Sequence, residues 1–341
     1  SDKVNFFAVA EYFNLTAANK TVNKLYKEHL VSTNQYIKSL GKRIEQNFLR
    51  SYGNAKFDRV IQFCGYEDEM ILLYSQMCIR DRHNDMLAEI KTRSNQRKDL
   101  LEYAYHTYDN VVAVTDDIVA PTQILAGKDK KINIVKNTID YKTILANSEQ
   151  PIALDPTTKC SVEPEKFYEI MQSDAKKFIN VGRYSPEKGH DRLIDAFYKL
   201  WQKDNSIYLI IMGGNSRAKK YEELIEKVNE MGLSENVILL LSVSNPYPII
   251  KACDGFILSS LYEGFGLVLA EADILGIPIV STDITGPRTF MKKYGGTLIE
   301  NSDEGVYKGL QMLYNGEIKP INVDYEAYNR ECVAEFEKLF E

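Results

Sequence analysis

Two carboxylates, Glu263 and Glu271, lie eight positions apart around a glycine pair and the start of an apolar stretch. Residues 255–258 predict a strand that leads into the turn holding Glu263, and residues 267–275 predict the helix holding Glu271. Glu271 is then about two turns into that helix, on the face that looks back at the turn. The free amides of a helix N-terminus favour an anion such as a phosphate. Since carboxylates repel phosphate, this pattern suggests hydroxyl-rich groups on either side of it, such as a sugar and a ribose.

Two cations follow another predicted strand, at residues 177–181. Arg183 and Lys188 lie in a short loop between Gly182 and Gly189. An arginine can hold phosphate oxygens through paired hydrogen bonds, and a lysine adds a point charge. Prearranged cations beside a developing negative charge typically make a large catalytic contribution. Two surface cations on an ordinary loop are the alternative, but the glycines and the position after a strand favour a ligand site.

Both stretches resemble motifs of the retaining glycosyltransferases of family four, which have the GT-B fold. Glu263 and Glu271 fall on the two acidic positions of the E-x7-E signature, and residues 182–189 match G-R-x-x-x-x-K-G. In that family the first glutamate contacts the donor sugar and the second contacts the ribose. The resemblance covers residues 57–340 and is strongest over 178–280. It implies transfer of a sugar, with retention, from a nucleoside diphosphate donor (a UDP-sugar first among them) to a hydroxyl of a polymer, lipid-linked or glycan acceptor such as teichoic acid.

The resemblance also extends to smaller features. Gly213 and Gly214 follow the predicted strand 206–212, and Asn245 lies in the segment that runs along the base in the family. His83 resembles the family's histidine loop, although a surface or helix-capping role, with Asp85 as the cap, is equally open. The implied catalytic residues are Glu263, Arg183, Lys188 and His83, and the implied donor contacts are Gly182, Gly213, Gly214, Asn245, Gly264, Phe265, Gly266, Leu267 and Glu271.

Short apolar runs alternating with helical stretches predict an α/β fold with doubly wound parallel sheets. Further strands are expected at residues 57–64, 110–114, 131–135, 237–241 and 277–280. Further helices are expected at 15–30, 34–50, 190–201, 219–231, 246–252 and 325–340. The predicted organisation is a partial acceptor-side domain at 1–145, a connection at 146–175, a nucleotide-sugar domain at 176–320 and a terminal helix at 321–341 that crosses back to the first domain.

Two stretches depart from the family pattern. Family members begin with a strand and a glycine-rich loop, which residues 1–54 do not supply, so the first domain is predicted to be incomplete. Residues 75–82, Ser-Gln-Met-Cys-Ile-Arg-Asp-Arg, are charged and poorly strand-like. They suggest a foreign insertion or a corrupted gene segment, which would damage one strand of the first sheet and misplace His83.

The composition excludes several classes of protein. A net charge of −6 over 341 residues argues against nucleic acid as the main partner. No apolar run approaches the length of a membrane span, and the start lacks a signal-peptide pattern. The five scattered cysteines fit a reducing cytoplasm. The basic stretch 20–59 predicts a solvated helix face, with weak contact to anionic lipid or polymer at the inner membrane face as the alternative.

No Asp-x-Asp triplet occurs, which suits the metal-independent GT-B class and predicts neither a metal nor another resident cofactor. Two other functions remain open from the sequence. One is a nucleotide-sugar epimerase or glycerophosphotransferase of related architecture. The other is a non-catalytic fragment that binds a nucleotide sugar.

Overall fold

The computed structural model describes residues 60–63, 77–81, 102, 105–106, 110–214 and 219–339. The chain divides into two compact units, Ser1–Val135 and Lys136–Glu341. The predicted domain boundary lies later, at residue 145. Residues 136–145 belong to the second unit, where the Ile139 backbone exchanges hydrogen bonds of 2.9 and 2.8 Å with the Asn329 side chain. His83, Asp85 and the predicted helices at 15–30 and 34–50 lie outside the described residues.

The first unit contains a parallel sheet in the order β1(Val60–Phe63), β2(Met77–Asp81), β3(Asn110–Ala113), β4(Ile132–Ile134), and the helix α6(Asp116–Ala126). The expectation that residues 75–82 are poorly strand-like is wrong, because β2 pairs with β1 on one side and with β3 on the other. The charged residues Arg80 and Asp81 are untypical of a buried strand. Backbone pairing with two neighbouring strands defines β2.

The second unit is built on a seven-stranded sheet in the order β11-β10-β9-β6-β7-β8-β5. Its parallel strands are β6(Lys177–Val181), β7(Tyr208–Gly213), β8(Val237–Leu241), β9(Gly255–Leu258), β10(Ile279–Thr282) and β11(Thr297–Ile299). The short β5(Lys159–Cys160) pairs antiparallel with β8.

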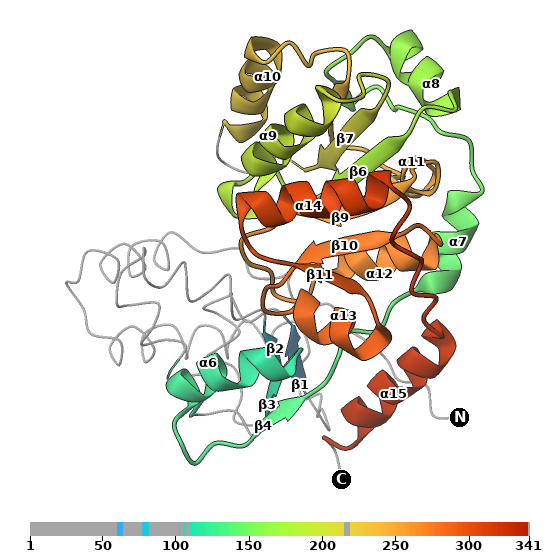
Figure 1. Ribbon diagram of the computed structural model, residues 1–341. Helices are drawn as coiled ribbons and strands as arrows, with labels where there is room; N and C mark the ends of the chain where they lie inside the picture. Colours follow the sequence, from blue (N-terminus) through green and yellow to red (C-terminus); the bar gives the residue numbers. More distant parts are fainter. Residues whose placement is uncertain are drawn as a thin grey trace, which may run out of the picture. The chain divides into compact units, whose positions relative to one another are not determined.

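Helices cover both faces of this sheet. The helices of the second unit are α7(Tyr141–Ser148), α8(Pro164–Gln172), α9(His190–Trp201), α10(Lys220–Glu230), α11(Tyr247–Lys251), α12(Leu267–Ile274), α13(Pro287–Tyr294), α14(Asp303–Tyr314) and α15(Tyr325–Glu337). Apolar residues of α9, α10 and α14 form one buried core with alternate residues of the strands, such as Leu209 and Ile211 of β7. Figure 1 shows α9 and α14 side by side over the sheet. On the other side, α12 packs against β9 and β10.

Because helices cover both faces of this sheet, its strands are buried on both sides, and their sequences are continuous apolar runs. The predicted strands at 177–181, 237–241 and 255–258 and the predicted helix at 190–201 are confirmed residue for residue. The strand predicted at 277–280 instead runs over Ile279–Thr282. Pro278, which has no amide hydrogen, precedes its first residue. Within the second unit, the elements α7, β5, α8, α13, β11 and α14 were not predicted.

The sheet topology brings two loops together. β6 and β9 are adjacent parallel strands, with Phe178 opposite Gly255 and Ile179 opposite Phe256. Their carboxyl ends therefore lie at the same edge, where ligands bind in doubly wound sheets. The loop after β6 carries Arg183 and Lys188, and the loop after β9 carries Glu263.

The segment before α15 is fastened to α12 by a buried carboxylate. Asp273 accepts hydrogen bonds from the amides of Asn322 and Val323, at 2.8 and 3.0 Å, and from the Tyr325 hydroxyl at 2.9 Å. These contacts fix the start of α15 within the second unit. That this helix crosses back to the first domain stays a prediction.

Candidate functional site

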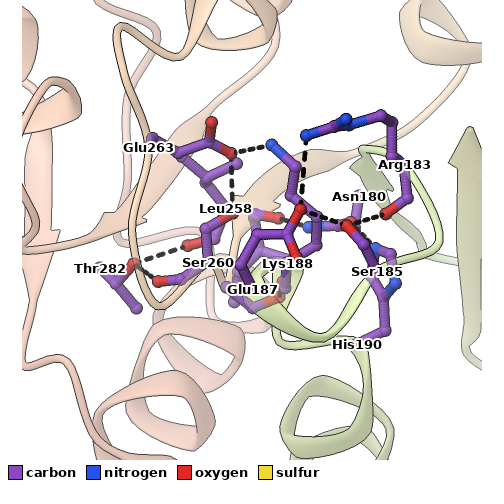
Figure 2. Close-up of polar contacts among 12 residues, drawn as sticks. Asn180, Arg183, Ser185, Glu187, Lys188, His190, Leu258, Ser260, Glu263 and Thr282 are labelled. Carbon is purple, nitrogen blue, oxygen red and sulfur yellow. Dashed lines mark hydrogen bonds and ion pairs between the residues drawn. The ribbon is translucent and has the colours of Figure 1, made fainter. Parts of the chain in front are cut away.

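The core of the site is an ion pair between the two predicted motifs. The Lys188 ammonium lies 2.5 Å from Oε1 of Glu263, and the two side chains are only 15% and 10% exposed. Figure 2 shows them reaching toward each other from neighbouring loops. Seventy-five positions separate them in the sequence. The fold therefore joins a cation and an acid that the sequence analysis assigned to separate motifs.

The Glu263 carboxylate is positioned by a buried polar cluster. The Ser260 hydroxyl donates to Oε1 of Glu263 at 2.9 Å. The Ser260 carbonyl accepts from the Thr282 hydroxyl at 2.7 Å and from the Arg192 guanidinium at 2.8 Å. Arg192 also donates twice to the carbonyl of Ser259, at 2.8 and 2.6 Å. Helix α9 and strand β10 thus hold the end of β9 rigidly beneath Glu263.

The loop that carries Lys188 is fixed against the same strand end. The Leu261 amide donates to the Glu187 carbonyl at 2.7 Å, and the Ser259 hydroxyl donates to the Lys188 carbonyl at 3.0 Å. Gly189 makes this approach possible, because its φ is +66° and a Cβ there would lie 2.2 Å from the Ser259 carbonyl oxygen. Only glycine tolerates both conditions.

A buried histidine lies beneath this loop. His190 Nε2 contacts Oδ1 of Asn180 at 3.1 Å, and the Asn180 amide donates to the Ile257 carbonyl of β9 at 2.7 Å. The Asn180 oxygen is thus the acceptor, so the neutral imidazole donates from Nε2. Burial lowers the pKa of His190 to about 3, which keeps the ring neutral. The pair ties β6, β9 and the start of α9 together.

Arg183 is the more accessible cation of the site. Its side chain is 60% exposed, and Nη2 lies 3.4 Å from Oε1 of Glu187, whose side chain is 15% exposed. The remaining guanidinium hydrogens are available to an incoming anion.

Glu271 lies in α12 and is half-buried. Burial raises the pKa of its carboxyl above the usual range. Among the described residues, no hydrogen bond or ion pair is formed by this side chain. Burial and, second to it, the charge of Glu271 raise the pKa of Tyr247, the first residue of α11. A half-buried carboxylate of this kind can accept hydrogen bonds from ligand hydroxyls.

The glycines predicted as donor contacts lie in the backbone at the same edge of the sheet. The Gly182 amide donates to the Met212 carbonyl at 2.9 Å, and the Tyr184 amide donates to the Gly214 carbonyl at 3.0 Å. A Cβ on Gly213 would lie 1.9 Å from the Gly182 carbonyl oxygen, so the loops after β6 and β7 touch through backbone alone. The residues Gly264, Phe265, Gly266 and Leu267 lead from Glu263 into α12, with Gly266 as its N-cap.

Asn245 has a local role in the structure. Its amide nitrogen donates to the Asn147 carbonyl at 2.9 Å and contacts Oε1 of Gln150 at 3.2 Å, which ties the segment after β8 to the end of α7. A donor contact from its side chain stays a prediction. In the same segment, Ser242 has a left-handed φ of +65°.

Within the described part of the chain, no three His, Cys, Asp or Glu side chains gather as metal ligands would. None of the described helices combines the length and the apolar character needed to cross a bilayer.

The charged residues of the site were predicted from the sequence, but most of the residues that position them were not. Arg192, Asn180 and Thr282 had no predicted role in the site. Each of these side chains acts on a partner from another strand. The one local signal was polar residues at the ends of apolar strands.

Comparison with known proteins finds a family match over the part of the chain that holds this site. Residues 162–330 match the family described as Glycosyl transferases group 1. The chain carries a group 1 glycosyl transferase domain. This group 1 domain contains Arg183, Lys188, Glu263 and Glu271.

Two relatives match mainly this domain. The uncharacterized glycosyltransferase MJ1059 of Methanocaldococcus jannaschii is 39% identical over 140 residues, which cover 40% of this chain and 34% of the relative. The N-acetylgalactosamine-N,N'-diacetylbacillosaminyl-diphospho-undecaprenol 4-alpha-N-acetylgalactosaminyltransferase of Campylobacter jejuni is 29% identical over 187 residues, which cover 54% of this chain and 44% of the relative. The chain thus spans less than half the length of either relative.

A solved structure shows the wider fold. Anabaena Alr3699/HepE in complex with UDP matches with a TM-score of 0.64 at 15% identity, over 88% of this chain and 80% of that chain. The predicted fold class, GT-B, is confirmed.

Proposed function

We propose that this protein is a retaining hexosyltransferase, which moves a sugar from a nucleoside diphosphate donor to a hydroxyl acceptor. In this proposal Arg183 and Lys188 hold the diphosphate, and Glu263 accepts hydrogen bonds from the sugar hydroxyls. The amides after Glu263 support the sugar or the phosphate, and Glu271 holds the ribose. Neither a metal ion nor another resident cofactor takes part.

The observation that carries the proposal is the 2.5 Å contact between Lys188 and Glu263 at the carboxyl edge of the sheet. A cation and a carboxylate that share one small space suit a ligand with an anionic part next to a hydroxyl-bearing part. A sugar attached to a diphosphate has this character. When it binds, Lys188 can turn to a phosphate oxygen, and the Glu263 carboxylate, still held by Ser260, can accept from a sugar hydroxyl in place of the Lys188 ammonium.

The reaction we propose proceeds on one face of the sugar. The bond between the anomeric carbon and the phosphate oxygen breaks, and the acceptor oxygen bonds to the same carbon. The acceptor's proton passes to the departing phosphate. Arg183 and Lys188 stabilise the charge that gathers on this phosphate, and the prearranged loops bring the reactants together. Glu263 is not a covalent nucleophile in this scheme.

For the donor we propose a UDP-sugar, supported by the UDP complex of the Anabaena protein with the same fold. For the acceptor we propose a lipid-linked or polymeric glycan of the cell surface, supported by the Campylobacter relative, whose name describes an undecaprenol diphosphate acceptor. Such an acceptor would place the enzyme in the cytoplasm, in peripheral contact with the inner face of the membrane.

The test begins with a calorimetric panel of UDP, GDP, ADP and CDP and their glucose derivatives. We expect one base to bind with micromolar affinity. The matching donor is then incubated with and without membrane lipid extract, and free nucleoside diphosphate is measured. Acceptor-dependent release supports the transferase. Conversion of the donor sugar without acceptor would instead identify an epimerase, and binding without release would identify a binding protein.

A further inference from the structure

The loop after β6 contains a second carboxylate that the proposed donor site does not use. Glu187 lies in the short turn Pro186–Lys188, and its side chain is only 15% exposed. Oε1 of Glu187 accepts a hydrogen bond from the Ser185 hydroxyl and lies 3.4 Å from Nη2 of Arg183. Figure 2 shows this carboxylate between the two side chains. Glu187 is therefore held on one side and contacts an exposed cation on the other.

The backbone of Glu187 is fixed as well. Its carbonyl accepts from the Leu261 amide at 2.7 Å, which joins the loop to the segment that leads to Glu263. Glu187 thus connects the loop of the cations to the loop of the sugar-side carboxylate. A residue anchored at both its backbone and its side chain can impose its position on a mobile neighbour.

We propose that Glu187 is a positioning residue, which holds the Arg183 guanidinium ready for the donor diphosphate. This inference rests on the proposed function. Arg183 is 60% exposed, and in isolation its long side chain would sample many rotamers and lose them when a ligand binds. The contact with Glu187 restricts that freedom in advance. It engages one terminal nitrogen, and the other N–H groups of the guanidinium remain for phosphate oxygens.

Glu187 would have the opposite effect on donor binding if it acted as a counter-charge. A carboxylate close to an anion site repels phosphate, so Glu187 could weaken the donor complex instead of preparing it. The two roles predict opposite results when only the charge is removed. Glutamine keeps an oxygen that can accept from Ser185 and Arg183, whereas alanine removes both contacts.

The experiment is a double-mutant cycle with UDP as the probe, measured by calorimetry on the full chain. We expect Glu187→Ala to weaken UDP binding about fivefold, the upper end of what exposed ion pairs contribute. In an Arg183→Ala background, Glu187→Ala should cause no further loss, because the residue acts through that arginine. Glu187→Gln should stay within about twofold of the wild type, since positioning survives. Melting curves of each variant check that the fold is retained.

Two results would overturn the assignment while the proposed function stands. An equal loss on Glu187→Ala with and without Arg183 would show a role in loop structure only. Tighter binding of UDP by Glu187→Gln than by the wild type would show a counter-charge. A wild-type protein that binds no nucleoside diphosphate at all would contradict the proposed function, and the role of Glu187 with it.

Discussion

Acid should destabilise the second unit through His190. The imidazole is 1% exposed, and within the described residues its Nδ1 has no hydrogen-bond partner. A protonated ring would place a second N–H, and a charge, in this buried position. Burial therefore lowers the pKa of His190 from 6.5 to about 3. The perturbation we propose is His190→Gln, which keeps an amide donor but does not titrate.

The size of the effect follows from proton linkage. Below pH 6.5 the unfolded chain binds a proton at residue 190 that the folded chain does not bind until about pH 3. The free energy of unfolding then falls by about 1.4 kcal/mol for each pH unit. The stability is complete above pH 6.5 and is lost as the pH falls. Between pH 6.5 and 5 the wild type should lose about 2 kcal/mol relative to the variant.

The assay is urea unfolding at pH 7.5, 6.5, 5.5 and 5.0, followed by tryptophan fluorescence. Trp201 is the single tryptophan of the chain and packs against the core of the second unit, so it reports on this unit. The quantity of interest is the difference in unfolding free energy between wild type and variant at each pH, in which the titration of all other groups cancels. A difference that stays constant from pH 7.5 to 5.0 would refute the reasoning, because His190 would then titrate as it does in the unfolded chain.

Three further substitutions test other parts of the site. Glu271→Gln should raise the melting temperature at pH 7, because burial raises the pKa of this carboxyl and so disfavours its charged form in the folded protein; the gain should vanish below about pH 4. For the same variant, calorimetry should show roughly tenfold weaker UDP binding. Ser242→Gly should stabilise the protein by about 0.5 kcal/mol in urea unfolding, because glycine relieves the left-handed φ of +65° but gains entropy when unfolded. Gly213→Ala should weaken UDP binding by at least about tenfold and lower the melting temperature, because its Cβ would meet the Gly182 carbonyl oxygen at 1.9 Å. Unchanged UDP affinity in the Gly213 variant would contradict a donor site at this edge.

Local patterns carried the prediction of most of the second unit. The five buried residues of β8 and the amphipathic α9 can be recognised in isolation, because burial on both faces of a sheet or on one face of a helix leaves a direct pattern. The first sheet shows the limit of this approach. Strand β2 contains Arg80 and Asp81 and exists because β1 and β3 flank it. The residues of the segment do not indicate which strands will pair with it.

In the site, too, local motifs were predicted, but the contacts between them were not. Glu263 and Lys188 were predicted from separate local motifs, but their contact depends on β9 lying next to β6. The order of strands is set by crossover connections that hydrophobic periodicity does not reveal. Arg192 lies in the helix predicted at 190–201 and had no predicted role, yet it is buried, because the missing Cβ of Gly189 lets the Ser259 carbonyl approach.

The central claim is that Glu263 serves the sugar while Arg183 serves the diphosphate. The most direct measurement compares Glu263→Gln with Arg183→Ala, using donor turnover and UDP affinity side by side. The account predicts that Glu263→Gln lowers kcat by about a hundredfold or more and leaves UDP affinity within a few fold, whereas Arg183→Ala lowers both. If both variants lost UDP affinity to the same degree, the division of the site into a sugar side and a phosphate side would be contradicted.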